Sequence, residues 1–455
     1  MDLRVSDILR ECNAKLVCGD ENVVLGDFVK DTRIIKENDV YVGIKGDNLD
    51  GNTLYEQAFE KGAKVCILEH IDNSDEIKEK YPDRVIVIVD DSIKALQQLA
   101  AYKRSLYNIP VIGITGSVGK TSARDMVASV VATKYNVWKT QGNYNNHLGL
   151  PLTILGLKDH EALVVEMGMN HSGEISVLSK IAKPDIAIIT NVGTAHIGNL
   201  GSREGILKAK LEILDGLKQD GLLIINNDDD MLSSWYDKQE NKDKIITFGI
   251  DCDSDIRATD IKIGERGSSF KIDEGEFEVP IAGGHYIYHA LLGIVVGRKL
   301  NISDDKIVEG IKNIELTKGR MEMIKCSDDI VVINDCYNAN YDSMKAAIDY
   351  LGKVENRRKI AVLGDMLELG EFSETLHKKI GEEVSMNSID VLITIGKLGK
   401  LINEVAGGTH LIKYHFDNNE EAIKKIKSIM ESKDIILVKA SNAMKFIEIV
   451  EAIRK

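Results

Sequence analysis

The chain has 455 residues, of which 72 are acidic and 58 basic, giving a formal net charge of −14 at pH 7. This length is too great for a single hydrophobic core and predicts two or three domains. The acidic balance excludes a nucleic-acid binder that relies on a basic surface. No apolar run reaches the roughly 20 residues that span a bilayer, and the N-terminus lacks the apolar core of a signal peptide, so we expect a cytoplasmic protein without membrane insertion.

The pattern of strands and helices predicts an α/β protein of three domains. Short apolar strands alternate with helical stretches at the start, which indicates a small N-terminal α/β domain over 1–84. From 85 to 316, apolar strands alternate with amphipathic helices around a glycine-rich loop, as is typical of a mainly parallel sheet. A new series of strands and helices over 317–455 predicts a C-terminal Rossmann-like, doubly wound domain.

The segment 111–122, VIGITGSVGKTS, is an apolar strand that breaks into glycines and ends on Lys-Thr-Ser, and a helical pattern over 123–133 follows it. A strand, a glycine loop and a helix in this order predict a phosphate-binding loop. Lys120 supplies a cation for the outer phosphates, and the Thr121 hydroxyl can ligate Mg²⁺. The alternative is a glycine turn with a surface lysine. We therefore expect ATP to bind Gly116, Ser117, Val118, Gly119, Lys120, Thr121 and Ser122.

Polar residues also follow the strands on either side of this loop. Glu166 ends an apolar strand and Asp335 directly follows another, at the strand end where ligands bind in parallel sheets. We expect Glu166 to meet the metal and Asp335 to bind ribose hydroxyls. A donor-rich loop suited to diphosphate or peptide carbonyls contains Asn143, Asn145 and Asn146.

Three further residues have no clear role from the pattern alone. As an isolated residue, His196 is better interpreted as a hydrogen-bonded loop histidine than as a ligand. Lys210 lies in a helix with several other charges, and Arg320 follows the second domain boundary. For both of these, an ordinary solvated side chain is as good an interpretation as a functional one.

Five strings spread along the chain, together with the short loop T-G-x-x-G-K-T-S, resemble the Mur ligase and folylpolyglutamate synthase superfamily. Its members join a carboxylate to an amine with ATP. The strings are most similar to those members that add D-alanyl-D-alanine to a UDP-N-acetylmuramoyl tripeptide through an acyl phosphate, which completes the pentapeptide precursor of peptidoglycan. They are GNYNNHLGLP at 142–151, EMGMNHSGEI at 166–175, TNVGTAHIGNLGSREGILKAKLEIL at 190–214, DCYNANYDSMKAAI at 335–348 and LGDMLELGE at 363–371.

The resemblance implies catalytic roles for Lys120, His196, Lys210 and Arg320. It implies that Lys210 carries a CO₂-derived carbamate and that Arg320 reaches the γ-phosphate when the domains close. Mg²⁺ would be held by Thr121, Glu166, His196 and the carbamylated Lys210. The implied substrate-binding residues are Thr32, Arg33, Lys45 and Gly46 for the UDP-sugar, and Asn143, Asn145, Asn146, Asn338, Asn340, Lys439 and Ser441 for the peptide parts.

Some positions depart from the family pattern. Tyr286 and His289 stand where the resembling ligases place asparagines that contact adenine, so we expect stacking or an altered hydrogen bond there. Tyr341 replaces a proline and Ala440 a glycine. The adenine-contacting residues are therefore predicted to be Tyr286 and His289, beside Arg320 and Asp335.

Two other functions remain open from the sequence. One is a different ligase of the superfamily, such as the diamino-acid-adding ligase or folylpolyglutamate synthase; the D-N-P-R string associated with diaminopimelate selection is absent. The other is a non-catalytic binding or regulatory protein, suggested by Tyr286 and His289. The retained Lys120, Glu166, His196 and Lys210 argue against the second hypothesis. We expect a monomer, with either lysine or diaminopimelate as the third peptide residue.

Overall fold

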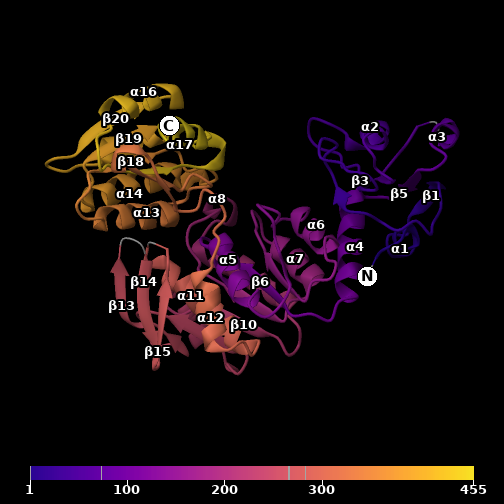
Figure 1. Cartoon of the computed structure of the whole chain (residues 1–455), viewed down its shortest axis with the longest axis horizontal. Helices are drawn as coiled ribbons and strands as arrows, with labels where there is room; N and C mark the ends of the chain where they lie inside the picture. The colour runs from indigo at the N-terminus through magenta and orange to yellow at the C-terminus, as the bar shows by residue number, and fades with distance from the viewer. Residues whose placement is uncertain (1, 73, 265–266, 282, 455) are drawn as a thin grey trace.

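The computed structural model describes residues 2–72, 74–264, 267–281 and 283–454. Three α/β units follow one another along the chain, and Figure 1 shows the central unit between the N-terminal and the C-terminal unit. The predicted α/β class with three units is confirmed. Within the ranges described, no helix is both long and apolar enough to cross a membrane.

The N-terminal unit is a five-stranded sheet in the order β1-β5-β4-β3-β2, with only the β1–β5 pair antiparallel. Its fifth strand, β5, pairs with β4 along four residues, so a division between 84 and 85 separates β5 from its own sheet. An apolar run next to a boundary does not reveal which sheet it joins. The strands are β1 (Lys15–Cys18), β2 (Phe28–Val29), β3 (Val40–Val42), β4 (Val65–Leu68) and β5 (Val85–Ile88), and the helices are α1 (Val5–Glu11), α2 (Tyr55–Glu60) and α3 (Ser74–Lys80).

The central unit is a seven-stranded, all-parallel sheet in the order β12-β11-β10-β9-β6-β8-β7. The strand β6 is buried throughout and lies between β8 and β9, so the loop that follows it opens at the middle of the carboxyl edge. That edge is where ligands bind in open parallel sheets. The strands are β6 (Val111–Thr115), β7 (Val137–Lys139), β8 (Ala162–Glu166), β9 (Ile186–Ile189), β10 (Leu222–Asn226), β11 (Ile245–Gly249) and β12 (Ile256–Arg257).

Helices cover this sheet and link it to its neighbours. The helix α4 joins the N-terminal unit to β6, and it packs against α1 on one side and against α6 and α7 on the other. The helix α11 packs along α5, which begins at the phosphate loop. The helices are α4 (Ser92–Ser105), α5 (Lys120–Val131), α6 (Gly149–Leu155), α7 (Glu174–Ala182), α8 (Ile197–Leu200), α9 (Arg203–Leu211), α10 (Asp230–Asp237), α11 (His285–Lys299) and α12 (Asp304–Lys312).

A small antiparallel sheet that the sequence analysis did not predict is inserted between β12 and α11. It contains β13 (Thr259–Gly264), β14 (Gly267–Ile272) and β15 (Gly275–Val279). Alternate residues of β14 are buried, and the rings of Phe270 and Phe277 stack with centroids 5.7 Å apart. This alternation and the two-residue turn between β14 and β15 are the local signals of a hairpin.

The C-terminal unit is a six-stranded sheet in the order β16-β17-β21-β18-β19-β20. Five strands are parallel, as the Rossmann-like prediction requires, and β16 adds an antiparallel edge. In Figure 1, α13 and α14 lie on the face toward the central unit and α16 and α17 on the other. The strands are β16 (Glu322–Lys325), β17 (Val331–Asn334), β18 (Lys359–Leu363), β19 (Val391–Ile395), β20 (Ile412–Phe416) and β21 (Ile435–Lys439); the helices are α13 (Tyr341–Lys353), α14 (Ser373–Met386), α15 (Gly399–Val405), α16 (Asn419–Ile429) and α17 (Ile447–Ile453).

Candidate functional site

The loop between β6 and α5 has the backbone of a phosphate cradle. Gly116 and Gly119 have φ values of 154° and 78°, which favour glycine. A Cβ on Gly116 would lie 1.8 Å from Thr190 Oγ1, and one on Gly119 would lie 2.7 Å from His289 Cε1. Neither position therefore accepts a side chain. The helix α5 begins at Lys120, so the loop ends directly at a helix N-terminus, where backbone N–H groups favour an anion.

Lys120 and Thr121 connect this loop to the edge of the sheet. The Lys120 ammonium donates to the Gly116 carbonyl oxygen at 2.8 Å. Burial lowers the pKa of Lys120; nearby Glu166 opposes that shift, and Arg320 reinforces it. The Thr121 hydroxyl donates to Glu166 Oε2 at 3.0 Å, at the end of β8. Hydroxyl and carboxylate oxygens are the ligands that Mg²⁺ prefers, so this pair suits a divalent cation next to bound phosphates.

Asn145, one of the predicted substrate-binding residues, also contacts this carboxylate. Its side-chain amide donates to Glu166 Oε1 at 2.8 Å. Both oxygens of Glu166 are therefore oriented by hydrogen bonds, and the side chain is buried. Such partners fix the position of a metal-ligating carboxylate.

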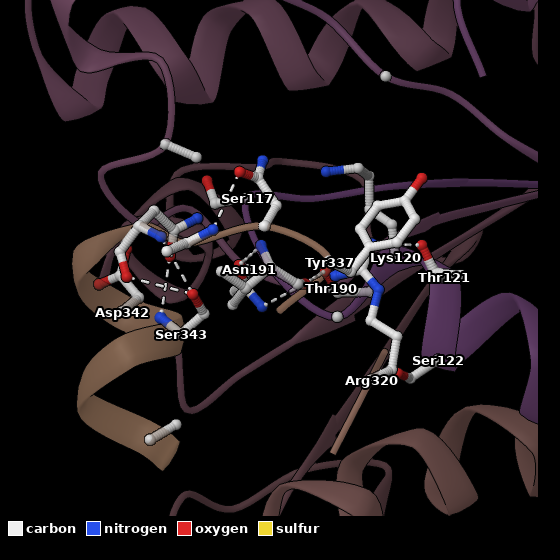
Figure 2. Close-up of a pocket in the computed structure, with 18 of the residues that line it drawn as sticks. Ser117, Lys120, Thr121, Ser122, Thr190, Asn191, Arg320, Tyr337, Asp342 and Ser343 are labelled. Atoms are coloured by element: carbon white, nitrogen blue, oxygen red, sulfur yellow. Dashed lines mark hydrogen bonds between the residues drawn. The ribbon is translucent and has the colours of Figure 1, made fainter. Parts of the chain in front are cut away.

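Arg320 approaches the phosphate loop from the start of the C-terminal unit. Its Nη2 donates to Thr121 Oγ1 at 3.0 Å, and its guanidinium lies 4.0 Å from the ring centroid of Tyr337 (Figure 2). The Nε atom of Arg320 is buried and has no hydrogen-bond partner among the described residues. A cation that follows the domain boundary thus lies directly beside the residues expected to hold phosphate.

The segment that carries Arg320 is anchored by a buried ion pair of α5. Thr317 N donates to Asp125 Oδ2 at 3.0 Å, and Arg124 Nη2 donates to Thr317 Oγ1 at 2.7 Å. Arg124 and Asp125 are each 1% exposed. Arg320 is therefore only three residues from a fixed attachment to the central unit.

His196 and Lys210 both lie near the loop, but in different surroundings. His196 has a φ of 60°, and its Nδ1 lies 3.1 Å from Glu368 Oε2 of the C-terminal unit. Burial, followed by the nearby Lys120 and Lys210, lowers the pKa of His196 to about 4. His196 is consequently neutral at pH 7 and able to accept a metal or a proton on a ring nitrogen.

Lys210 is buried in α9, with 1% of its surface exposed. Burial shifts its pKa well below the usual 10.5; Lys120 lowers it further, while Asp229 acts in the opposite direction. A neutral amine is therefore favoured at this position. The described residues contain no cluster of three or more histidine, cysteine or acidic side chains that could hold a metal by itself.

The predicted adenine-contacting residues lie in the first turns of α11. Tyr286 and His289 are 1% and 6% exposed, and their ring centroids are 5.6 Å apart in an edge-to-face arrangement. The His289 ring lies beneath Gly119, as the close approach to that glycine shows. Burial lowers the pKa of His289 to about 3 and that of the neighbouring His285 to about 4, so both rings are neutral.

Asp335 and Lys439 form one buried ion pair, although the sequence analysis assigned them to different ligands. Lys439 Nζ lies 2.5 Å from Asp335 Oδ2 and donates to the Asn338 carbonyl oxygen at 3.1 Å. Asn340 caps α13, because its side chain accepts from Ser343 N at 2.9 Å. The polar loop after β17 is thus fixed internally by groups that were predicted to bind substrates.

A cavity of about 700 Å³ lies between the central and C-terminal units. Its lining brings together most of the predicted residues: Ser117, Val118, Gly119, Lys120, Thr121, Ser122, Asn143, Asn145, Asn146, Glu166, His196, Tyr286, His289, Arg320, Asp335, Asn338, Asn340 and Lys439. Gly116, Lys210 and Ser441 do not line it, and neither do the N-terminal residues Thr32, Arg33, Lys45 and Gly46.

Comparison with known proteins agrees with this arrangement. The Mur ligase middle domain matches residues 114–297, and the Mur ligase glutamate ligase domain matches residues 319–442. A UDP-N-acetylmuramoyl-tripeptide–D-alanyl-D-alanine ligase of Bacillus subtilis is 40% identical over 95% of this chain and 93% of its own length. The ligase of the same name from Escherichia coli is 31% identical over 99% and 98%. This chain belongs to the MurF family of Mur ligases.

Solved structures support the same assignment. A crystal structure of MurF from Acinetobacter baumannii superposes with a TM-score of 0.89 at 28% identity, covering 99% of this chain and 98% of that one. MurF of Thermotoga maritima in complex with ADP gives 0.81 at 29% identity, covering 94% and 97%. Folylpolyglutamate synthase of Mycobacterium tuberculosis, at 15% identity and a TM-score of 0.61, shares the fold alone.

Several residues of this MurF-family site were not singled out from the sequence. Val118 N donates to Asn191 Oδ1 at 2.9 Å, and Thr190 Oγ1 donates to the Val118 carbonyl oxygen at 2.8 Å, so the loop after β9 supports the phosphate loop. Asp342 of α13 also lines the cavity. The string T-N-V-G-T-A-H contained the signal for Thr190 and Asn191, but only its histidine was assigned a role.

Proposed function

We propose that this chain is an ATP-dependent ligase that joins D-alanyl-D-alanine to a UDP-N-acetylmuramoyl tripeptide, a step of peptidoglycan precursor synthesis. One observation supports this most strongly: Thr121 of the phosphate loop contacts both Glu166 of the central unit and Arg320 of the C-terminal unit. The phosphate site is therefore assembled from both domains that match the Mur ligase family. Relatives similar over nearly their full length are named for this reaction.

The reaction has two steps. A terminal carboxylate oxygen of the tripeptide attacks the γ-phosphorus of ATP, which forms an acyl phosphate and releases ADP. The amine of D-alanyl-D-alanine then attacks the acyl carbon, loses a proton and displaces phosphate. Lys120, Arg320 and the N–H groups at the start of α5 stabilise the negative charge on the transferring phosphoryl group. Closure of the two units around the cavity excludes water that would hydrolyse the acyl phosphate.

The residues at the phosphate loop also suit Mg²⁺, which the fold family implies. The proposed ligands are Thr121 Oγ1 and Glu166 Oε2, which lie 3.0 Å apart, together with His196 and a carbamylated Lys210, as the family resemblance implies. When bound, Mg²⁺ neutralises charge on the phosphate oxygens. The burial of Lys210 favours the neutral amine that reacts with CO₂, and the carbamate would place an anion near His196. We therefore retain all four residues as the metal site.

The ligands are assigned to the units as follows. The N-terminal unit, residues 1–84 extended by β5, binds the UDP-sugar through Thr32, Arg33, Lys45 and Gly46. Residues 85–316, without β5, bind ATP, with Tyr286 and His289 beside the adenine, and Asp335 of the C-terminal unit lies beside the ribose. Residues 317–455 bind the dipeptide through Asn338, Asn340, Lys439 and Ser441. The ligase works as a monomer in the cytoplasm.

A ligation assay tests this function. The full-length chain is incubated with ATP, Mg²⁺ and UDP-muramoyl peptides ending in lysine or diaminopimelate, with and without D-alanyl-D-alanine. We expect one phosphate per pentapeptide formed, and no pentapeptide without the dipeptide. The assay is repeated with glutamate or a diamino acid in place of D-alanyl-D-alanine, because these are the acceptors of other reactions of the superfamily. Product with one of these acceptors and none with D-alanyl-D-alanine would contradict the assignment, and the absence of any ATP-dependent product would favour a binding protein.

A further inference from the structure

The loop that follows β9, residues 190–196, is attached to the phosphate loop by hydrogen bonds. We refer to it as the bridging loop. Val118 N donates to Asn191 Oδ1 at 2.9 Å, and Gly193 N donates to Ser117 Oγ at 2.9 Å. The position of the Gly193 backbone is therefore linked directly to the conformation of the residues expected to hold ATP.

The next amide of the same loop binds the C-terminal unit. Asp342 is the second residue of α13, and its Oδ2 accepts from Thr194 N at 2.7 Å and from Thr194 Oγ1 at 3.0 Å. A Cβ on Gly193 would lie 2.2 Å from Asp342 Oδ2, so the contact requires glycine there. Figure 2 shows Asp342 and Lys120 at opposite sides of the view, with Ser117 of the phosphate loop between them.

Two adjacent amides of one loop thus point to two different units. Gly193 N binds the phosphate loop and Thr194 N binds α13. Two residues later the loop ends at His196, which has a left-handed φ of 60° and lies beside Glu368 of the C-terminal unit. Because a non-glycine residue in this conformation is maintained only by its surroundings, a shift at Thr194 is expected to move His196 as well.

We propose that Asp342 is a positioning residue for ligation: by holding Thr194, it couples the docking of the C-terminal unit to the conformation of the phosphate loop and of His196. This inference rests on the proposed function, because it concerns the lifetime of the acyl phosphate. Hydrogen bonds to a carboxylate are among the stronger ones in proteins, and two of them converge on one oxygen here. The carboxylate is also favoured at the N-terminus of α13.

Loss of this contact has a specific chemical consequence. When the C-terminal unit docks less firmly, water gains access to the acyl phosphate. Attack by water regenerates the tripeptide carboxylate and releases phosphate, so ATP is consumed without formation of an amide. The ratio of phosphate released to pentapeptide formed then rises above one. A residue that only stabilises the fold would lower the amount of active enzyme without changing this ratio.

The test compares Asp342→Ala with Glu374→Ala in the full-length chain. Glu374 is likewise the second residue of a helix, α14, but its side chain is 74% exposed and lies 3.9 Å from Lys378. For Asp342→Ala we expect kcat to fall about tenfold or more, with KM for the UDP-tripeptide unchanged and a phosphate-to-pentapeptide ratio above one. Glu374→Ala should retain the wild-type kcat and a ratio of one.

Gly193→Ala disturbs the same contact from the bridging loop, so it should also raise the phosphate-to-pentapeptide ratio. Thermal unfolding confirms that each variant folds. If Asp342→Ala does not fold, Thr194→Val, which removes one of the two donors, should give a smaller change in the same direction. A ratio of one in every folded variant of Asp342, Thr194 and Gly193 would overturn the inference. Wild-type protein that forms no pentapeptide would instead overturn the proposed function, and the inference with it.

Discussion

The N-terminal loops and the cavity between the other two units differ in how their polar groups are satisfied. In the N-terminal loops, Thr32 donates to Gln57, and the 83% exposed Arg33 side chain pairs with Asp31 at 2.7 Å. In the cavity, Arg320 Nε and His289 Nδ1 are buried without hydrogen-bond partners among the described residues. Buried polar groups without partners are costly and require an explanation.

From this difference we expect the N-terminal loops to contribute binding and the cavity to carry out the chemistry. The surface loops are internally satisfied, so a ligand there replaces water and contributes modest affinity at each contact. The cavity holds neutral histidines, a lysine with a lowered pKa and an arginine from a second unit around one phosphate loop. A phosphorylated ligand would supply the missing acceptors. Substitutions should therefore affect kcat or nucleotide binding at the cavity, and KM for the UDP-tripeptide at the N-terminal loops.

Lys120→Ala should produce the largest effect. Loss of the phosphate-loop cation is expected to lower kcat by about 10²–10³-fold or more. UDP-tripeptide affinity should stay within about twofold, because the predicted UDP-binding residues do not line the cavity. Steady-state kinetics and calorimetry measure the two quantities. Near-normal turnover would show that this loop does not hold ATP, and an equal loss of UDP-tripeptide affinity would remove the distinction between the two regions.

Lys210→Met should abolish ligation and stabilise the fold at the same time. We expect an activity loss of about 10²-fold or more, as when another charge-stabilising group is removed. Carbamylation needs the neutral amine, so wild-type activity should fall as the pH is lowered or bicarbonate is removed, and a short-chain carboxylate should partly restore Lys210→Ala. Wild-type turnover of Lys210→Ala in CO₂-depleted buffer would show that the lysine is not part of the metal site.

The stability half of this prediction follows from the lowered pKa of Lys210. Without CO₂, the unfolded chain binds a proton at this lysine up to about pH 10.5, whereas the folded chain releases it at lower pH. The cost of the buried lysine is therefore complete below its folded pKa and disappears as the pH rises through 10.5. The melting temperature of Lys210→Met should exceed that of the CO₂-free wild type most at low pH. An equal difference at every pH would contradict the pKa shift.

The sequence predicted the parts of this site that depend on local patterns. The spacing of Gly116, Gly119 and Lys120 predicts the phosphate loop. Because Glu166 ends a predicted strand, its position at the same edge of the central sheet was also predicted correctly. Contacts between distant segments could not be predicted, because they depend on how separate units pack. Arg320 and Thr121 are 199 residues apart in the chain, and Asp342 and Thr194 are 148 apart.

Two features of the fold were not predicted from the sequence, for similar reasons. The strand β5 has the apolar pattern of a buried strand, and only its pairing with β1 and β4 assigns it to the N-terminal sheet. The antiparallel sheet β13–β15 is short, and its alternating pattern was overlooked in a chain dominated by parallel strands. In the site, Asp335 and Lys439 were expected to bind separate ligands, but the structure joins them in one ion pair.

Substitution of Tyr286 and His289 should have an intermediate effect, which concerns the selectivity between ATP and GTP. A pocket that relies on stacking discriminates weakly between purines, because it lacks directed hydrogen bonds to the base edge. We expect kcat/KM for ATP to exceed that for GTP by about tenfold or less. Replacement of both residues by leucine should raise KM for ATP about tenfold. A strong preference for ATP that survives in the double variant would show that other groups recognise adenine.

Arg33→Ala should have the smallest effect. Its ion pair with Asp31 is exposed, so the fold should lose little stability. We expect KM for the UDP-tripeptide to rise about fivefold or less, with kcat unchanged. Lys15→Ala, which removes an exposed cation of β1 in the same unit, is the matched control. A fall in kcat without a change in KM would contradict the division between binding loops and reactive cavity.

The most direct test of the central claim is the transfer of oxygen from substrate to phosphate. The terminal carboxylate of the UDP-tripeptide is labelled with ¹⁸O, and the phosphate released during ligation is analysed by mass spectrometry. Attack of that carboxylate on ATP in the cavity predicts one ¹⁸O atom in each phosphate, in a reaction that depends on D-alanyl-D-alanine. Unlabelled phosphate released in step with pentapeptide would mean that the carboxylate is not activated by phosphorylation, and the cavity would then not be the site of the proposed chemistry.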